Sequence, residues 1–165
     1  MKQLSIFVFT LAFAVSASAA LSSTDRKTML KLGQGDSSEV DLAKLVVPKA
    51  TNEEVKDFAQ RMISDHGKSF DRLDEIARAE KVTLKGGMDA EHKKFAKQLS
   101  KKKLGAAYDR TYMKQMVEDH KKDKSGLEKA IRKTKNLELK AWEGKELDTV
   151  KEHLKMAEDI RAQLK

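Results

Sequence analysis

Apolar residues recur every three or four positions through most of the chain, which is the spacing of amphipathic helices. The clearest run covers residues 52–80, where the inward positions are predicted to be Val55, Phe58, Ala59, Met62, Phe70, Leu73 and Ala77. Alternation of apolar and polar residues, which is typical of strands, is sustained nowhere along the sequence. The pattern therefore predicts an all-α protein.

Capping and helix-breaking residues divide this pattern into segments. The four long helices are predicted at residues 25–47, 52–80, 106–133 and 137–164. Their boundaries are marked by Thr24 as a cap, Pro48 as a stop, a Thr51–Glu54 capping box and Asn136 as a cap. Residues 81–105 are too many for a simple turn, and they include a short helical segment at residues 90–99. We expect a four-helix bundle with a short extra helix in the crossover between the second and third long helices.

Residues 1–20 differ in composition from the rest of the chain. Lys2 is followed by an uncharged apolar run over residues 4–15 and by Ala17-Ser18-Ala19, a small-x-small site for signal peptidase. A membrane-spanning helix needs about 20 apolar residues, so an uncleaved anchor is the weaker interpretation. No later stretch is apolar enough to span a bilayer. We predict a signal peptide at residues 1–20, a bundle domain at residues 21–165 and a location in the periplasm.

The chain is basic, with a formal net charge of +8, and it contains no cysteine, so its fold uses no disulfide. Basic runs such as residues 101–103 lack the interleaved aromatic residues on which nucleic-acid bases stack, which argues against a nucleic-acid partner. We interpret the charge as a solvated surface. Loose association with anionic lipid or polymer of the cell envelope is the alternative. The sequence does not indicate the oligomeric state.

Three of the four histidines fall on predicted inner faces of helices. His66, His120 and His153 each lie three or four residues from an apolar inward position, and each lies within about one turn of the middle of its helix. A residue at the middle of a helix keeps its height whichever way the helix runs, so these side chains should share one layer. Glu39, near the middle of the first helix, is predicted to face the same layer. His92 lies among charged residues of the crossover and is expected to be solvated.

One carboxylate and three imidazoles from four helices point to a metal site. Burying Glu39 without a partner is costly, and an ion bound by Glu39, His66, His120 and His153 removes that cost. A polar network in which Glu39 pairs with a protonated histidine is the alternative without metal. The donor set suits one divalent transition metal ion, zinc or iron first and copper as a further candidate. The Glu-x-x-His motif of di-iron bundles is absent, which favours a mononuclear site.

Neighbours of these histidines in the sequence extend the hypothesis. Asp65 precedes His66 and Asp119 precedes His120, and adjacent residues on a helix point about 100° apart. Both aspartates are therefore predicted to lie outside the ligand sphere and to orient an imidazole of another helix or pair with a lysine; solvated surface acids are the alternative. Three methionines one turn from the histidines suit copper or, more simply, core packing: Met62, Met116 and Met156.

Several segments resemble a known family. They read EVDLAKL at residues 39–45, VKDFAQRM at residues 55–62 and AAYDRTY at residues 106–112, with Asp-His pairs at residues 65–66 and 119–120. In this order they resemble a bacterial exported family called domain of unknown function 4142, whose members are often labelled outer membrane proteins. The resemblance covers residues 25–160 and implies a ferritin-like fold. It also implies that Glu39, both Asp-His pairs and His153 are family positions, but the family has no settled activity.

Three functions remain open at this point. The first is metal binding in the periplasm, for structure, storage or protection of the envelope against stress. The second is an enzyme that uses the same ion on peroxide or superoxide, although no nucleophile or acid-base pair supports it and no catalytic residue is predicted. The third is a metal-free module whose basic faces bind anionic polymers of the envelope.

Overall fold

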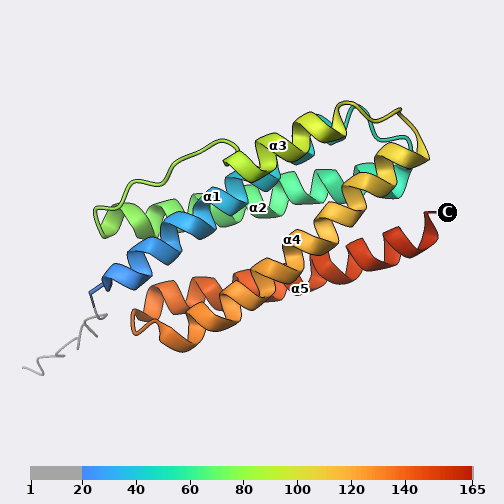
Figure 1. The fold of residues 1–165 in the computed structure, drawn as a ribbon. Coiled ribbons are helices and arrows are strands. Elements are labelled where there is room, and N and C mark those ends of the chain that lie inside the picture. Colours follow the sequence, from blue (N-terminus) through green and yellow to red (C-terminus); the bar gives the residue numbers. More distant parts are fainter. Residues whose placement is uncertain (1–19, 165) are drawn as a thin grey trace, which may run out of the picture.

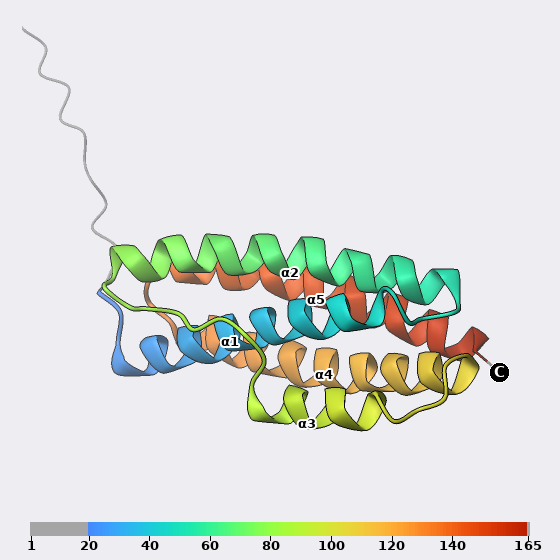
Figure 2. The ribbon, with the colours of Figure 1, turned by 90° about the horizontal axis from the view of Figure 1, so that it is seen from above.

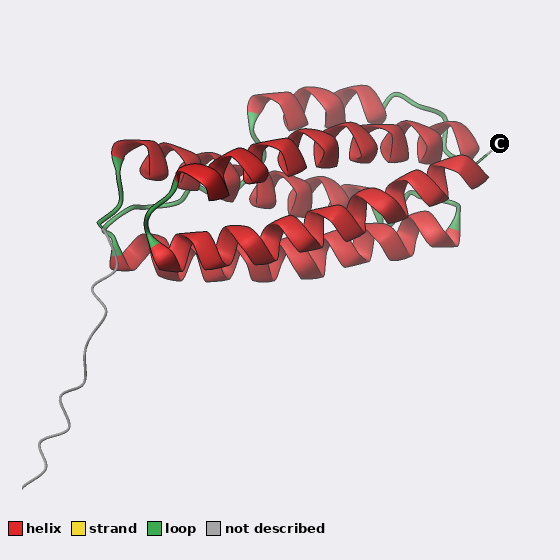
Figure 3. Ribbon diagram, turned by 90° about the horizontal axis from the view of Figure 1, so that it is seen from below, coloured by secondary structure: helices red, strands yellow, loops and turns green. Residues whose placement is uncertain are grey.

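Five helices and their connecting loops make up residues 20–164, the part of the chain that the computed structural model describes (Figure 1). The long helices are α1 (Ser23–Val46), α2 (Glu53–Ala79), α4 (Ala106–Lys133) and α5 (Leu137–Gln163), and the short one is α3 (Ala90–Leu99). Residues 20–164 contain no strand (Figure 3), so the all-α prediction is confirmed. None of their helices is long and apolar enough to cross a membrane. The predicted signal peptide lies, apart from Ala20, outside the described residues.

Two antiparallel hairpins form the bundle. The most extensive helix contacts join α1 to α2 and α4 to α5. Between α2 and α4 the chain returns along the bundle, so these two helices run in the same direction (Figures 1 and 2). A single long crossover of this kind is the ferritin-like connection that was predicted. The hairpins meet mainly through α2 and α5, whereas α1 and α4 contact each other much less, and α3 packs on both of them (Figure 2).

The first helix begins two residues earlier than predicted. Ser22 and Asp25 form a capping box, in which the Ser22 hydroxyl accepts from the backbone N–H of Asp25 at 3.0 Å and the Asp25 carboxylate accepts from that of Ser22 at 3.1 Å. The prediction that Thr24 caps this helix was therefore wrong. The Asn136 cap of α5 is confirmed, because its side chain accepts from the backbone of the first turn.

The second helix is capped by Asn52, whose side chain accepts from the backbone N–H of Val55 at 3.1 Å. The predicted capping box of Thr51 and Glu54 was wrong. The Thr51 hydroxyl donates instead to Asp109 of α4 at 2.7 Å, and this contact across the bundle outweighs the local one. The start of α2 is thereby tied to the first turn of α4.

Two apolar clusters fill the interior, one on each side of the middle of the bundle. The first includes Phe58, Tyr112 and Met116, and the second includes Leu73 and Trp142. Between them, every long helix contributes buried titratable side chains, which we call the polar layer: Asp36, Glu39, His66, Asp119, His120, Glu146 and His153. Burying these groups sacrifices apolar packing. The polar layer thus separates the two apolar clusters, and we take this layer as the candidate site.

Candidate metal centre

The three predicted histidines meet in the polar layer. His66 comes from α2, His120 from α4 and His153 from α5, and all three side chains are buried. Their ring centres form a triangle with sides of 5.6, 5.2 and 5.4 Å. The three side chains therefore converge, as the sequence predicted.

Each of these rings has one nitrogen fixed by a hydrogen bond. His120 donates from Nδ1 to the carbonyl oxygen of Met116 at 2.9 Å, because a carbonyl can only accept. His153 donates from Nε2 to the Asp65 carboxylate at 3.1 Å, and Nδ1 of His66 lies 3.0 Å from the Asp36 carboxylate. Hydrogen bonds of this type set the tautomer and ring orientation of histidines that bind metal ions.

The opposite nitrogens are buried and have no hydrogen-bond partner among the described residues. They are Nε2 of His66, Nε2 of His120 and Nδ1 of His153. One ring nitrogen of each histidine lies within 4.8 Å of those of the other two. If a ring nitrogen lies about 2.0 Å from zinc, the centres of two tetrahedrally placed rings are about 5 Å apart, which is close to the sides of the observed triangle.

Glu39 of α1 lies beside this triangle. Its side chain is 2% exposed, and neither carboxylate oxygen has a hydrogen-bond partner within residues 20–164. Its oxygens lie 3.8 Å from Nε2 of His66 and 3.8 Å from Nδ1 of His120. Potential ligand atoms of the three histidines all lie within 4.8 Å of one another, but Glu39 does not belong to this group. Glu39 therefore lies at the edge of the centre, in reach of two rings.

The histidines differ in charge. Burial lowers the pKa of His153 to about 4 and, with the positive charge of His66, takes the pKa of His120 well below its usual range. Burial opposes the charged form of His66 too, but its contacts with the Asp36 and Glu146 carboxylates outweigh this and raise its pKa well above the usual range. The rings of His120 and His153 are thus neutral. The ring of His66 carries a second proton, which a metal ion must displace in order to bind.

The sequence prediction missed two carboxylates of the layer. Asp36 lies 3.0 Å and Glu146 lies 3.4 Å from Nδ1 of His66, so they flank that ring from α1 and α5. Helical spacing could have indicated both, because Asp36 lies three residues before Glu39 and Glu146 lies seven before His153, each on the same helix face. Charged residues at such positions are usually solvated, which is why the pattern alone did not select them.

The two predicted supporting aspartates have different surroundings. Asp65 fixes a ring of a neighbouring helix, His153, as expected, and it also pairs with Arg61 at 3.1 Å. Asp119 does not contact the three histidines within hydrogen-bond distance; it accepts two hydrogen bonds from Gln115 at 3.0 and 2.9 Å. Its ring neighbour is His92, whose Nε2 lies 3.9 Å away.

His92 was predicted to be solvated, and this was wrong. Its side chain is only 11% exposed, because α3 packs on α1 and α4 and turns the ring toward Asp119. The charged sequence around His92 gave no indication of this docking.

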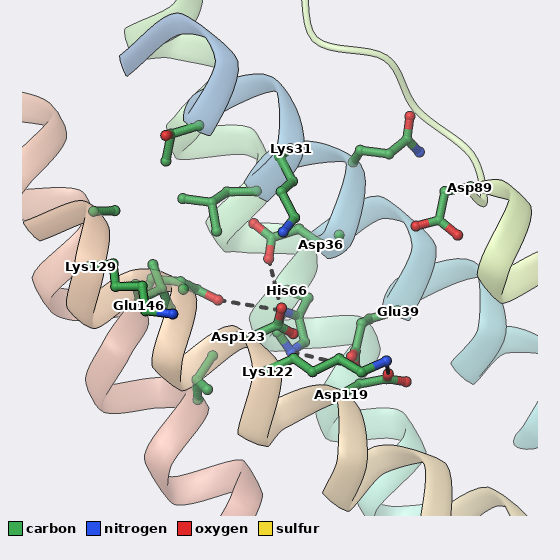
Figure 4. A pocket seen from close by; sticks show the side chains of 18 of the residues that line it. Lys31, Asp36, Glu39, His66, Asp89, Asp119, Lys122, Asp123, Lys129 and Glu146 are labelled. Carbon is green, nitrogen blue, oxygen red and sulfur yellow. Dashed lines mark hydrogen bonds and ion pairs between the residues drawn. The ribbon is translucent and has the colours of Figure 1, made fainter. Parts of the chain in front are cut away.

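A cavity of about 370 Å³ leads from the surface to the polar layer. All five helices contribute to its lining, α2 through His66, and Glu39 lines it as well. Seven carboxylates and four lysines line the cavity. Figure 4 labels most of these carboxylates: Asp36, Glu39, Asp89, Asp119, Asp123 and Glu146. This excess of acidic side chains, four of them buried, favours a cation inside: Asp36, Glu39, Asp119 and Glu146.

Comparisons with known proteins bear on the fold. The family model of a domain of unknown function, DUF4142, matches residues 10–160. No curated protein matches the chain. Among solved structures, a DUF305 fragment from Deinococcus radiodurans is similar with a TM-score of 0.78 and 11% sequence identity, over 88% of this chain and 100% of that one. At this identity the similarity supports the helical fold alone.

Proposed function

The chain belongs to the DUF4142 family, a domain of unknown function, and we propose from its buried centre that it binds one divalent transition metal ion through His66, His120 and His153. One observation carries the proposal: one ring nitrogen of each of the three buried histidines lies within 4.8 Å of those of the other two, and each ring has one buried nitrogen without a partner in the described part of the chain while its opposite nitrogen is held by a hydrogen bond. This is the arrangement of metal-binding histidines.

A polar network without metal explains the layer less well. In such a network a protonated His66 pairs with Glu39, and Nε2 of His66 does lie 3.8 Å from that carboxylate. This pairing leaves the buried nitrogens of His120 and His153 that lack a hydrogen bond without a partner among the residues described. A buried lone pair without a hydrogen-bond partner is costly, and each of these two neutral rings has one. An ion accepts all three lone pairs at once, and Glu39 lies close enough to approach as a fourth ligand.

The donor set favours zinc or iron. Three imidazoles with a nearby carboxylate suit Zn²⁺ and Fe²⁺, and imidazoles also bind Cu²⁺. A thioether contribution is less well supported, because Met62 and Met116 belong to the apolar cluster beside the layer. We therefore propose zinc or iron as the resident ion, with copper as the next candidate.

The proposed role is metal binding in the periplasm, for storage or envelope protection. The location rests on the predicted signal peptide at residues 1–20. The burial of the histidines suits retention of an ion more than rapid exchange with solvent. Loose association of the basic surface with anionic envelope material is compatible with this role and does not depend on the metal.

Zinc binding by protein made without a histidine tag and stripped with a chelator tests the proposal. We expect His120→Ala to lose one equivalent of zinc that wild type retains after gel filtration, as measured by mass spectrometry of the metal. Lys121→Ala is the matched control, because this neighbouring side chain is exposed. At a free zinc concentration 100 times Kd, binding should stabilise wild type by about 2.7 kcal/mol, seen as a higher Tm. Equal zinc content in wild type and His120→Ala contradicts the proposal.

A further inference from the structure

We propose that Glu39, His92 and Asp119 form a second divalent cation position beside the three-histidine centre. One potential ligand atom from each of these residues lies within 4.8 Å of the other two. They come from α1, α3 and α4, and all three line the cavity. Only Glu39 is shared with the neighbourhood of the histidine centre, so this position can be tested separately.

The ring of His92 is oriented for binding. Asp89, the N-cap of α3, accepts from the backbone N–H of His92 at 2.8 Å and lies 2.9 Å from its Nδ1. Donation from Nδ1 leaves the lone pair on Nε2. That nitrogen is buried, has no hydrogen-bond partner in the described part of the chain, and points to Asp119. A ring held at one nitrogen, with the opposite nitrogen open, repeats the pattern of the three other histidines, which are held by a carboxylate at His66 and His153 and by a carbonyl at His120.

Hydrogen bonds fix α3 against α1. The Ser38 hydroxyl accepts from the backbone N–H of Asp89 at 2.9 Å, and the Ser37 hydroxyl accepts from that of Gly87 at 2.7 Å. Gly87 has a φ of +89°, which glycine adopts without strain. Since Ser38 adjoins Glu39, these bonds hold His92 at a defined position relative to that carboxylate.

The two carboxylates have free binding capacity. Both oxygens of Glu39 are buried and unpartnered among the described residues. Asp119 is 5% exposed and is oriented by Gln115, but each carboxylate oxygen keeps a second lone pair. Figure 4 shows the Glu39 and Asp119 side chains close together, and a carboxylate oxygen of one lies within 4.8 Å of a carboxylate oxygen of the other. A cation is the ligand that both carboxylates and the His92 nitrogen can bind together.

The donor set indicates the class of ion. Two carboxylates and one imidazole are a harder set than three imidazoles, and they suit Mn²⁺ or Fe²⁺ more than copper. The ammonium of Lys122 lies 3.6 Å from Asp119 and 2.8 Å from Glu91. This side chain is 60% exposed and can move away. Its positive charge should nevertheless weaken cation binding, so a variant that removes this charge should bind the cation more tightly.

Manganese binding to chelator-treated full-length protein tests the position, because the room-temperature electron paramagnetic resonance signal of free Mn²⁺ is lost on binding. We expect wild type to bind Mn²⁺, His92→Ala to bind it at least about tenfold more weakly, and Lys122→Ala to bind it roughly fivefold more tightly. Lys94→Ala, an exposed change on the same helix, should match wild type. His153→Ala should keep Mn²⁺ binding, since His153 does not belong to this group.

The outcomes separate the two proposals. Loss of Mn²⁺ binding in His92→Ala alone supports the second position whatever happens to zinc at the histidine centre. Loss in His153→Ala alone, or equal affinity of wild type and His92→Ala, overturns it and leaves the histidine centre standing. Absence of Mn²⁺ binding by wild type at millimolar concentrations also overturns it. If His92→Ala melts well below Lys94→Ala, the Lys122→Ala result decides: unchanged affinity there contradicts the position.

Discussion

Replacing Glu39 by glutamine is expected to change stability in opposite directions with and without metal. Burial raises the pKa of Glu39 from 4.5 to about 8. A carboxyl group with a raised pKa holds a proton in the folded state that the unfolded state releases, so stability falls as the pH rises from 4.5 to 8. At about 1.4 kcal/mol per unit of pKa, the loss is about 3 kcal/mol at pH 7 and approaches about 5 kcal/mol above pH 8.

Urea unfolding in the presence of a chelator measures this effect. The free energy of unfolding of Glu39→Gln should exceed that of wild type by an amount that grows by about 3 kcal/mol between pH 5 and pH 7, because glutamine does not ionise. Titrating groups that do not interact with Glu39 cancel in the difference, whereas His66, whose raised pKa is due in part to the Glu39 carboxylate, does not. Asp41→Asn, a partly exposed change on the same helix, should show no such growth.

Saturating zinc should reverse the order. Zinc compensates the buried carboxylate of wild type and stabilises it, whereas Glu39→Gln loses a charged neighbour of the ion and gains less. A difference between the two proteins that stays constant from pH 5 to pH 8 in chelator would refute the reasoning that burial keeps Glu39 protonated.

Three further changes address the layer and its surroundings. Asp65→Asn removes the charged acceptor 3.1 Å from Nε2 of His153 and should weaken zinc binding about 10- to 100-fold in competition with a coloured chelator. Phe58→Ala removes a buried ring that packs 6.3 Å from the rings of His120 and His153, and it should lower the free energy of unfolding in urea by about 3 to 5 kcal/mol. Burial raises the pKa of Glu143 from 4.5 to about 7, so wild type loses stability as the pH rises through this range, and Glu143→Gln should be more stable at pH 8 by about 1 to 3 kcal/mol in urea.

Each of these changes has a control on its own helix. Asp57→Asn is exposed and should leave zinc affinity unchanged, and equal affinities of Asp65→Asn and wild type would show that Asp65 does not support the ring. Phe70→Ala removes a partly buried ring and should cost less than Phe58→Ala. Glu152→Gln is exposed and should not alter the pH dependence; a Glu143→Gln variant no more stable at pH 8 than wild type contradicts burial of an ionising group.

Helical spacing was sufficient to predict the bundle and its central histidines. His66, His120 and His153 each lie one turn from apolar residues and near the middle of a long helix, so their direction and their height follow from the sequence alone. The same reasoning put Glu39 beside them, where it lies within 3.8 Å of two rings.

The remaining parts of the site depend on contacts between distant segments. Burial of His92 follows from the docking of α3 on α1 and α4, which local charge does not reveal. Asp36 and Glu146 are buried because they pair with His66, and a pattern of apolar residues does not show such a pairing. Thr51 donates a hydrogen bond to Asp109 of α4 in place of forming the predicted cap, and this too is a contact across the bundle.

The division of the bundle into two hairpins has a consequence for assembly. Glu39 and His66 come from the hairpin of α1 and α2, whereas His120 and His153 come from that of α4 and α5. The proposed three-histidine site is therefore complete only where the two hairpins meet. If the proposed ion binds here, it should stabilise the docking of the two hairpins, and its removal should weaken the interface between them more than the helices of either hairpin.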